Sequence, residues 1–164
     1  MPLGLKRYQQ EGDDHFITFS CHNRLPYLDS PKSKEILEQV IERTRRTHNF
    51  LIYAYVLMPE HLHLLLSEPK NLSSTLRVIK GESSKLLKGS REHFWQPRYY
   101  DFNVFTTRKF KEKIQYIHRN PVTRGLVSKP EDYRWSSFNH YATGEPRPIE
   151  IESQWTTRQR TPHK

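Results

Sequence analysis

The order of strand-like and helix-like segments predicts an α+β fold of the ferredoxin-like type, an antiparallel sheet with helices packed on one face. Segments of alternating apolar residues are interleaved with segments in which apolar residues recur every three to four positions. Their order is β-α-β-β-α-β, as in a ferredoxin-like sandwich, followed by one further helix and an extension. We therefore expect one layered unit rather than separate helical and sheet domains.

The first strand and the first helix have the clearest signals. Residues 15–23 are rich in β-branched and aromatic side chains, which indicates a strand. Ser30 is a suitable N-cap, Pro31 suits the first helical position, and apolar residues then recur at helical spacing. Basic residues fill the last turn before Asn49, where they complement the negative end of the helix dipole.

Two strands are expected in the middle of the chain. Residues 50–58 form a continuous apolar and aromatic run that Pro59 breaks, and residues 61–67 begin another run almost at once. A connection this short joins only antiparallel neighbours. The two segments therefore form a hairpin.

The second half of the chain completes the pattern. Residues 71–89 carry a broad apolar stripe at helical spacing, and residues 94–105 are an aromatic strand interrupted by Pro97. Residues 106–120 are expected to form a third helix, closed by Pro121. This last helix is the element added to the ferredoxin-like core.

The length of 164 residues suits one domain, which we assign to residues 1–145. Near its end, residues 133–146 (YRWSSFNHYATGEP) suggest an aromatic flap or short helix, with Trp135 as a packing anchor. Residues 146–164 contain proline, arginine and threonine and are expected to form a mobile or surface-wrapped tail.

Basic residues dominate the charge of the chain. Lysine and arginine outnumber aspartate and glutamate 27 to 18, which gives a net charge of +9. The chain also has three Trp, nine Tyr and eight Phe residues, some interleaved with basic side chains. Phosphate contacts and base stacking need this mixture, so single-stranded nucleic acid is the expected partner.

Other compositional features exclude some classes of protein. No apolar run approaches the roughly 20 residues that a membrane-spanning helix needs, so no membrane partner is expected. The N-terminus lacks a secretory signal pattern, and the single Cys21 cannot form an internal disulfide. We expect a cytoplasmic, DNA-associated protein.

Two histidines interrupt the apolar strand at 61–67. Residues two apart on a strand face the same way, so His61 and His63 project together while the leucines between and after them point into the core. Such a pair can bind one metal ion and leave coordination positions open. The alternative is two polar residues on the solvent-facing side of an edge strand, and the pair alone does not exclude it.

The third helix supplies partners for the pair. Tyr116 and Asn120 are four residues apart and so share a helical face, whereas His118 lies about 200° round the helix from Tyr116 and is expected to be structural. Asn120 can give an oxygen ligand. Nitrogen and oxygen ligands without cysteine are compatible with Mg²⁺ or Mn²⁺. A tyrosine beside such an ion can attack phosphorus, although a hydrolase would use water instead.

Two stretches taken together resemble the single-tyrosine HUH transposases of the IS200/IS605-like family. MPEHLHLLL resembles their histidine-hydrophobic-histidine motif, and YIHRNPVTRGLV resembles their catalytic-tyrosine helix. HFITFSCHNRLPYL and PEDYRWSSFNHYATGE are similar to the REP-associated branch of these proteins. The resemblance covers about residues 7–145.

The resemblance implies a ferredoxin-like fold and metal-dependent cleavage and joining of single-stranded DNA beside hairpins, through a 5′-phosphotyrosine. His61, His63 and Asn120 match the metal ligands, and Tyr116 matches the nucleophile. Glu60 stands where the family often has asparagine, and its side chain is expected to point away from the histidines. The REP-associated branch also implies a monomer, although insertion-sequence relatives act as dimers.

A set of basic residues lies on the approach to the third helix and is expected to follow a DNA backbone, ordinary solvated charge being the alternative. It consists of Arg98, Arg108, Lys109, Lys111 and Lys113. A non-catalytic DNA-binding regulator derived from a transposase would use the same surface, so the enzyme and the regulator are both retained as hypotheses.

Overall fold

The computed structural model describes residues 14–160 and contains a four-stranded antiparallel sheet with the strand order β2-β3-β1-β4. This is the expected ferredoxin-like arrangement. The elements are β1 (Asp14–Ser20), η1 (His22–Arg24), α2 (Pro31–His48), β2 (Ile52–Leu57), β3 (His61–Ser67), α3 (Leu72–Leu87), β4 (Tyr100–Val104), α4 (Thr107–Thr123), η2 (Pro130–Asp132), α5 (Phe138–Thr143) and α6 (Gln154–Arg160).

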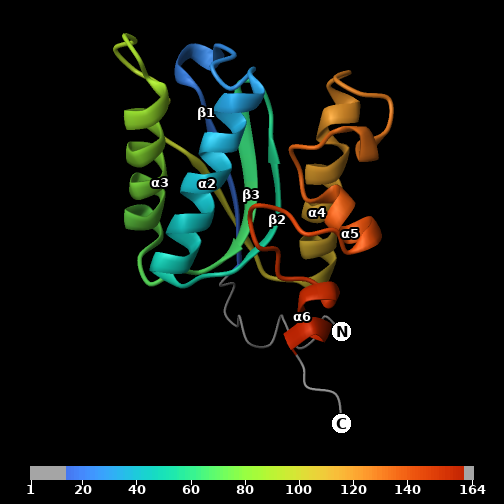
Figure 1. Ribbon diagram of the computed structural model, residues 1–164. Coiled ribbons are helices and arrows are strands. Elements are labelled where there is room, and N and C mark those ends of the chain that lie inside the picture. The colour runs from blue at the N-terminus through green and yellow to red at the C-terminus, as the bar shows by residue number, and fades with distance from the viewer. Residues whose placement is uncertain (1–13, 161–164) are drawn as a thin grey trace.

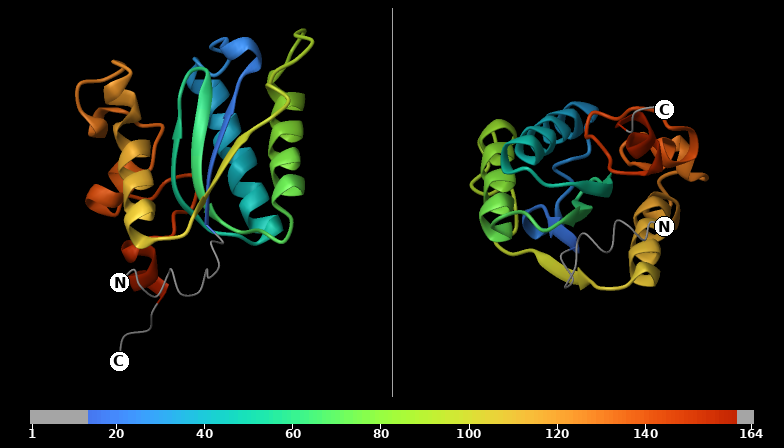
Figure 2. Two further views of the ribbon diagram at one scale, coloured as in Figure 1. Left: turned by 180° about the vertical axis from the view of Figure 1, so that it is seen from behind. Right: turned by 90° about the horizontal axis from the view of Figure 1, so that it is seen from below.

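The sheet is covered on both faces. Helices α2 and α3 pack side by side on one face, as expected, and α4 lies on the other face against β2 and β3 (Figure 1). The view from below in Figure 2 shows the sheet between these two layers. On the α2 and α3 side the core includes Leu62, Leu64 and Leu66 of β3, each fully buried. The interior of β3 is therefore shielded from water on both sides.

Helix α2 begins and ends where its sequence signals place it. The Ser30 hydroxyl accepts a hydrogen bond from the Ser33 amide at 3.1 Å, which satisfies one free donor of the first turn. At the other end, Asn49 adopts a left-handed conformation with φ of 55°. Asparagine tolerates this conformation better than most residues, which explains the stop.

The strand expected over 94–105 is shorter than predicted, because only residues 100–104 belong to the sheet. Residues 94–96 instead pair with the last residue of β1 and the residues just after it: the His22 amide donates to the Phe94 carbonyl at 2.8 Å, and the Gln96 amide donates to the Ser20 carbonyl at 2.9 Å. Pro97 has no amide hydrogen and separates this pairing from β4.

Helix α4 also differs from its predicted end at residue 120, because it runs through Pro121 to Thr123. Proline removes one backbone donor, but later amides continue the pattern: Arg124 donates to the Asn120 carbonyl and Leu126 to the Pro121 carbonyl, both at 2.9 Å. The helix therefore carries its last turn, with Arg124 at its C-cap, beyond the expected stop.

The C-terminal segments cover the outer edge of β2. The Leu57 amide donates to the Trp135 carbonyl at 2.8 Å, and the Glu152 amide donates to the Ile52 carbonyl at 2.8 Å. Trp135 is buried, in line with its expected anchoring role, and Ile149 and Ile151 are buried in the core. Packing therefore continues past the expected boundary at residue 145. Within residues 14–160, no helix is both long and apolar enough to span a membrane.

A histidine of β1, buried between two carboxylates, connects β1 with β4 and with the residue that follows β3. Nδ1 of His15 lies 2.7 Å from Oδ1 of Asp101, and its Nε2 contacts Oε1 of Glu68. Burial lowers the pKa of His15, but the hydrogen bonds and charges of the two carboxylates raise it by more, so the net shift is upward. The folded protein therefore favours the imidazolium form.

We expect this contact to make stability depend on pH. A folded-state pKa above the unfolded value of about 6.5 means that the stabilisation is complete below that pH and is lost as pH rises through the folded pKa. The free energy of unfolding from urea titrations should fall on the alkaline side for the wild type and fall less for His15→Gln. Equal pH dependence in the two proteins would contradict the charged contact.

Candidate metal and nucleophile site

The two histidines of β3 lie inside the molecule, not on a wet edge. Strand β3 pairs with β1 on one side and β2 on the other, and α4 packs over this part of the sheet. His61 is 3% exposed and His63 5% exposed. Their Nε2 atoms face each other at 3.2 Å. The alternative of two solvated residues on an edge strand is therefore wrong.

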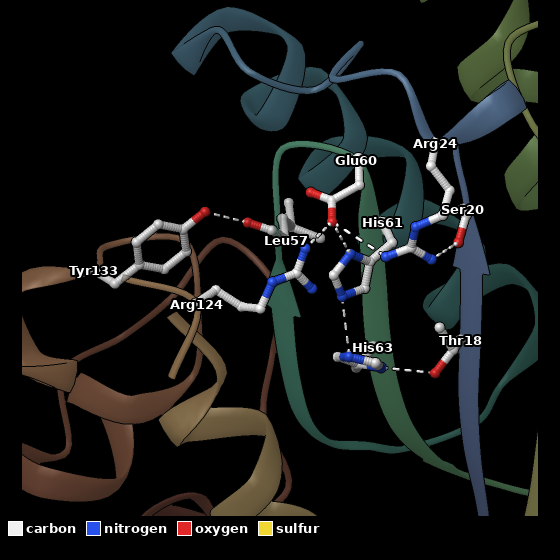
Figure 3. A network of polar contacts seen from close by, with 9 residues as sticks. All are labelled: Thr18, Ser20, Arg24, Leu57, Glu60, His61, His63, Arg124 and Tyr133. Carbon is white, nitrogen blue, oxygen red and sulfur yellow. Dashed lines mark hydrogen bonds and ion pairs between the residues drawn. The ribbon is translucent and has the colours of Figure 1, made fainter. Parts of the chain in front are cut away.

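Partners at the outer ring nitrogens hold both imidazoles in this orientation (Figure 3). The Thr18 hydroxyl lies 2.7 Å from Nδ1 of His63, from the facing position on β1. A Glu60 carboxylate oxygen lies 3.1 Å from Nδ1 of His61, close enough to favour a proton on that nitrogen although its direction is poor for a hydrogen bond. With a proton on each Nδ1, both Nε2 lone pairs point into the same space.

This space suits a cation. Two nitrogens bound at about 2.1 Å to one ion, at roughly a right angle, are on the order of 3 Å apart, close to the observed 3.2 Å. Burial lowers the pKa of His61 and, together with the charges of His61 and Lys113, lowers that of His63 to about 3. Both rings are therefore neutral at neutral pH, which is the form that binds metals.

Asn120 offers an oxygen donor from α4. Its side chain is 4% exposed, and its Oδ1 atom is buried without a hydrogen-bond partner. Leaving such an atom unpaired costs about 1–3 kcal/mol, so it is a plausible ligand position. In the described part of the chain no group of three or more His, Cys, Asp or Glu side chains is placed to hold an ion. A third protein ligand would therefore have to be of another type, and the amide oxygen of Asn120 is a candidate because it is buried and unpartnered.

Tyr116, one helical turn before Asn120, contacts His63 of the histidine pair. Its ring centroid lies 5.3 Å from that of His63 and 5.9 Å from that of Phe16, edge to face in both cases. The side chain is 50% exposed. The phenol of Tyr116 thus lies beside His63 and is also accessible from solvent.

Glu60 does not point away from the histidines, contrary to expectation. Its Oε2 atom lies 3.1 Å from Nδ1 of His61, 2.7 Å from Nη2 of Arg124 and 3.2 Å from Nη2 of Arg24. Glu60 precedes β3 directly, in the tight turn after β2, so its side chain is not bound by the alternation of the strand. The two arginines hold it beside His61.

The five basic residues expected to follow DNA are not one patch. Lys113 packs over the rings of Phe16 and Phe102, with Nζ 4.5 and 4.6 Å from their centroids, and burial lowers its pKa. Lys109 shares its helical face with Lys113 and Tyr116, but Nζ of Lys109 also lies 3.2 Å from Glu112.

The other three lie elsewhere. Arg108 pairs with Glu112 at 3.3 Å, and Lys111 is exposed about 200° round the helix from Lys113. Arg98 is exposed in the segment between α3 and β4. Of the five basic residues, Lys109 and Lys113 therefore lie on the same side of α4 as Tyr116.

Sequence reasoning missed Arg24 and Arg124. Arg24 reaches the site because it and Asn23 adopt left-handed conformations, with φ of 53° and 55°. No local sequence pattern predicts a left-handed conformation at an arginine. Arg124 was accessible to prediction, because it lies four residues after Asn120 and so on the same helical face. The expected stop at Pro121 hid it.

Comparison with known proteins identifies the family. The family model described as "Transposase IS200 like" matches residues 14–120, which include both histidines, Tyr116 and Asn120. The chain belongs to the IS200-like transposase family.

Relatives within this family place the chain near one branch. It is 29% identical over 137 residues to the REP-associated tyrosine transposase of Escherichia coli K12, covering 82% of this chain and 81% of the relative. It is 24% identical over 119 residues to a putative REP-associated tyrosine transposase of Haemophilus influenzae Rd, covering 63% of this chain and 68% of the relative. A solved structure of a REP-associated tyrosine transposase bound to a REP hairpin superposes with a TM-score of 0.72, at 26% identity and 87% coverage of each chain.

His118 lies on the other side of the transposase's helix α4 and packs it against α5. Its Nε2 atom is 2.7 Å from the Ser137 hydroxyl, and its ring contacts those of Phe138 and Tyr141. Burial lowers its pKa to about 4. These contacts agree with the expected structural role.

We expect His118→Ala to lower the free energy of unfolding by about 1–3 kcal/mol, because it removes buried ring packing and one hydrogen bond of the Ser137 hydroxyl. Chemical denaturation measures this loss. A Mn²⁺ titration of the folded variant should match the wild type. Weakened metal binding with unchanged stability would contradict the structural assignment.

Proposed function

We propose that this transposase nicks and rejoins single-stranded DNA beside hairpins, in a metal-dependent reaction with a covalent 5′-phosphotyrosine intermediate on Tyr116. One observation carries the proposal: an accessible tyrosine ring lies 5.3 Å from the ring of His63, whose Nε2 atom faces that of His61 at 3.2 Å. A nucleophile and a pair of neutral nitrogen ligands thus come from one sheet and one helix of the same chain.

His61, His63 and Asn120 would hold the divalent ion, Mg²⁺ or Mn²⁺. Two nitrogens and one amide oxygen suit Mn²⁺ well, whereas Mg²⁺ prefers an all-oxygen shell. When bound there, the ion would neutralise phosphate oxygens and so stabilise charge that develops as the phosphodiester is attacked. Thr18 and Glu60 would keep the two imidazoles in their ligating orientation.

Tyr116 would supply the attacking oxygen. A bond forms between Oη and phosphorus while the bond from phosphorus to the 3′ oxygen breaks, and the phenol proton is lost as the 3′-hydroxyl is released. The phosphotyrosine preserves the energy of the broken phosphodiester. A 3′-hydroxyl can therefore attack it in reverse and rejoin the strand without ATP.

The DNA partner is inferred from charge and from a relative. A net charge of +9 favours a polyanion, and a structure with the same fold at 26% identity is bound to a REP hairpin. Lys109 and Lys113 would meet the backbone near Tyr116, with Arg98, Arg108 and Lys111 as more distant contacts. We propose that one protomer suffices, since Tyr116 contacts His63 of its own chain.

Incubating the protein with labelled hairpin DNA and Mn²⁺ should give a protein–DNA adduct that survives denaturation. Tyr116→Phe should abolish the adduct because it lacks the attacking oxygen, and His118→Ala should keep it as a folded control. Denaturing gel electrophoresis measures both. Nicking that persists in Tyr116→Phe would indicate water as the nucleophile. Hairpin binding insensitive to chelation, with no adduct, would indicate the non-catalytic regulator.

Loss of a residue that only supports a metal ligand typically weakens metal binding by about 10–100-fold. Removing a ligand itself should weaken Mn²⁺ binding by more than this. We expect this for His61→Ala and His63→Ala, and a smaller loss for Asn120→Ala because an oxygen from water can replace the amide. Calorimetric titration without DNA gives these affinities independently of activity. Wild-type affinity in either histidine variant would remove these residues from the metal site.

A further inference from the structure

Two arginines from distant parts of the chain converge at the His61 end of the site. Arg24 comes from η1 and Arg124 from the C-cap of α4, and Figure 3 shows them reaching Glu60 from opposite sides. Their Nη2 atoms lie 3.2 and 2.7 Å from the same carboxylate oxygen, Oε2 of Glu60. Two guanidinium groups therefore share one anionic atom.

Arg24, Arg124 and Glu60 together carry a net positive charge that can attract a further anion. Two guanidinium groups and one carboxylate sum to one net positive charge, and neutral His61 does not change this. The carboxylate is largely enclosed, at 13% side-chain exposure, whereas the side chains of Arg24 and Arg124 are 54% and 44% exposed. Each guanidinium therefore still has N–H groups that water or a ligand can reach, and guanidinium forks match the geometry of phosphate.

We propose that Arg24 and Arg124 form a clamp for one backbone phosphate of the single-stranded DNA flank, and that Glu60 is the positioning residue that holds the clamp. The proposal rests on the proposed function, which brings single-stranded DNA to this site and places its reacting phosphate beside Tyr116. Its ligand is a phosphodiester next to the one that reacts.

The position of the clamp indicates why it would hold a neighbouring phosphate. Tyr116 contacts His63, whereas the arginines and Glu60 gather at His61, and the two imidazole centroids are 4.7 Å apart. A strand whose reacting phosphate lies between the histidines and Tyr116 would place an adjacent phosphate toward the arginines. Gripping that phosphate would fix the register of the strand at the nucleophile.

Glu60 gives the clamp its preorganisation. Long arginine side chains lose rotamer entropy when they bind a ligand, and a shared ion pair that already orders them reduces this loss. The Ser20 hydroxyl, which accepts a hydrogen bond from Nη1 of Arg24 at 3.1 Å, restrains that side chain further. Glu60 also ties the C-cap of α4 to the start of β3.

The test measures binding without chemistry, in Tyr116→Phe protein with EDTA. The probes are a DNA hairpin with mixed-sequence single-stranded flanks and the same hairpin without flanks. The slope of log affinity against log salt reports phosphate contacts, at about 0.7 per phosphate for single strands. For the flanked probe we expect the double variant Arg24→Gln plus Arg124→Gln to have a slope shallower by about 0.7. Once one arginine has been replaced, replacing the other should cost less DNA affinity. The flankless probe should show no change.

Matched variants separate a clamp from general charge. Arg46→Gln removes an exposed arginine that pairs with Glu42 on α2, at 3.4 Å, and should leave the slope unchanged. Arg24→Lys and Arg124→Lys should retain it, because they keep the charge. In a Glu60→Gln background the Arg24→Gln and Arg124→Gln substitutions should each cost less affinity than in the parent protein.

An unchanged slope in the double arginine variant, or an equal change for both probes, would overturn the clamp. Full additivity of the two arginine substitutions would show separate contacts rather than a shared one. If Arg24→Gln and Arg124→Gln cost the same DNA affinity in the Glu60→Gln background as in the parent protein, Glu60 does not position the arginines. Absence of binding to both probes by the parent protein would instead refute the proposed hairpin partner, so the two failures are distinguishable.

Discussion

The alternation of side chains along β3 is the constraint on which the site and the core both depend. Its even-numbered leucines fill the layer against α2 and α3, and its two histidines face α4 across the sheet. Because the side-chain period of a strand is two, a slip of one residue would place the histidines in the apolar core and the leucines at the site. Pairing with β1 and β2 on both sides resists that slip.

Burying two imidazoles requires compensation, and the surrounding elements supply it from different parts of the chain. Thr18 on β1 contacts His63, Glu60 in the turn before β3 contacts His61, and Tyr116 on α4 packs edge to face against His63. Each contact restrains the orientation of a ring, and the Thr18 hydroxyl also forms a hydrogen bond with Nδ1 of His63. The same contacts therefore stabilise the fold and fix the geometry of the site. An interior strand can provide such contacts on both of its sides, whereas a loop cannot.

Local sequence patterns predicted most of the helices and strands correctly. Ser30, Pro31 and Asn49 bound α2 as expected, and the period-two run at 61–67 is β3. Errors arose where tertiary contacts overrode local rules. Residues 94–96 pair with the end of β1 instead of extending β4, and the chain tolerates Pro121 inside α4. The orientation of Glu60 depends on arginines about 36 and 64 residues away in the chain, and no single-sequence pattern encodes such contacts.

The histidines and the tyrosine belong to one folded polypeptide, and this has a consequence for how the protein behaves in a cell. Their encounter is intramolecular, so its effective concentration is set by the packing of α4 on the sheet and not by the number of molecules present. Dilution does not separate them. A protein made in only a few copies would thus keep the proposed nucleophile and metal ligands together, and its scarcity would limit how often it meets the proposed DNA partner rather than whether these groups are assembled.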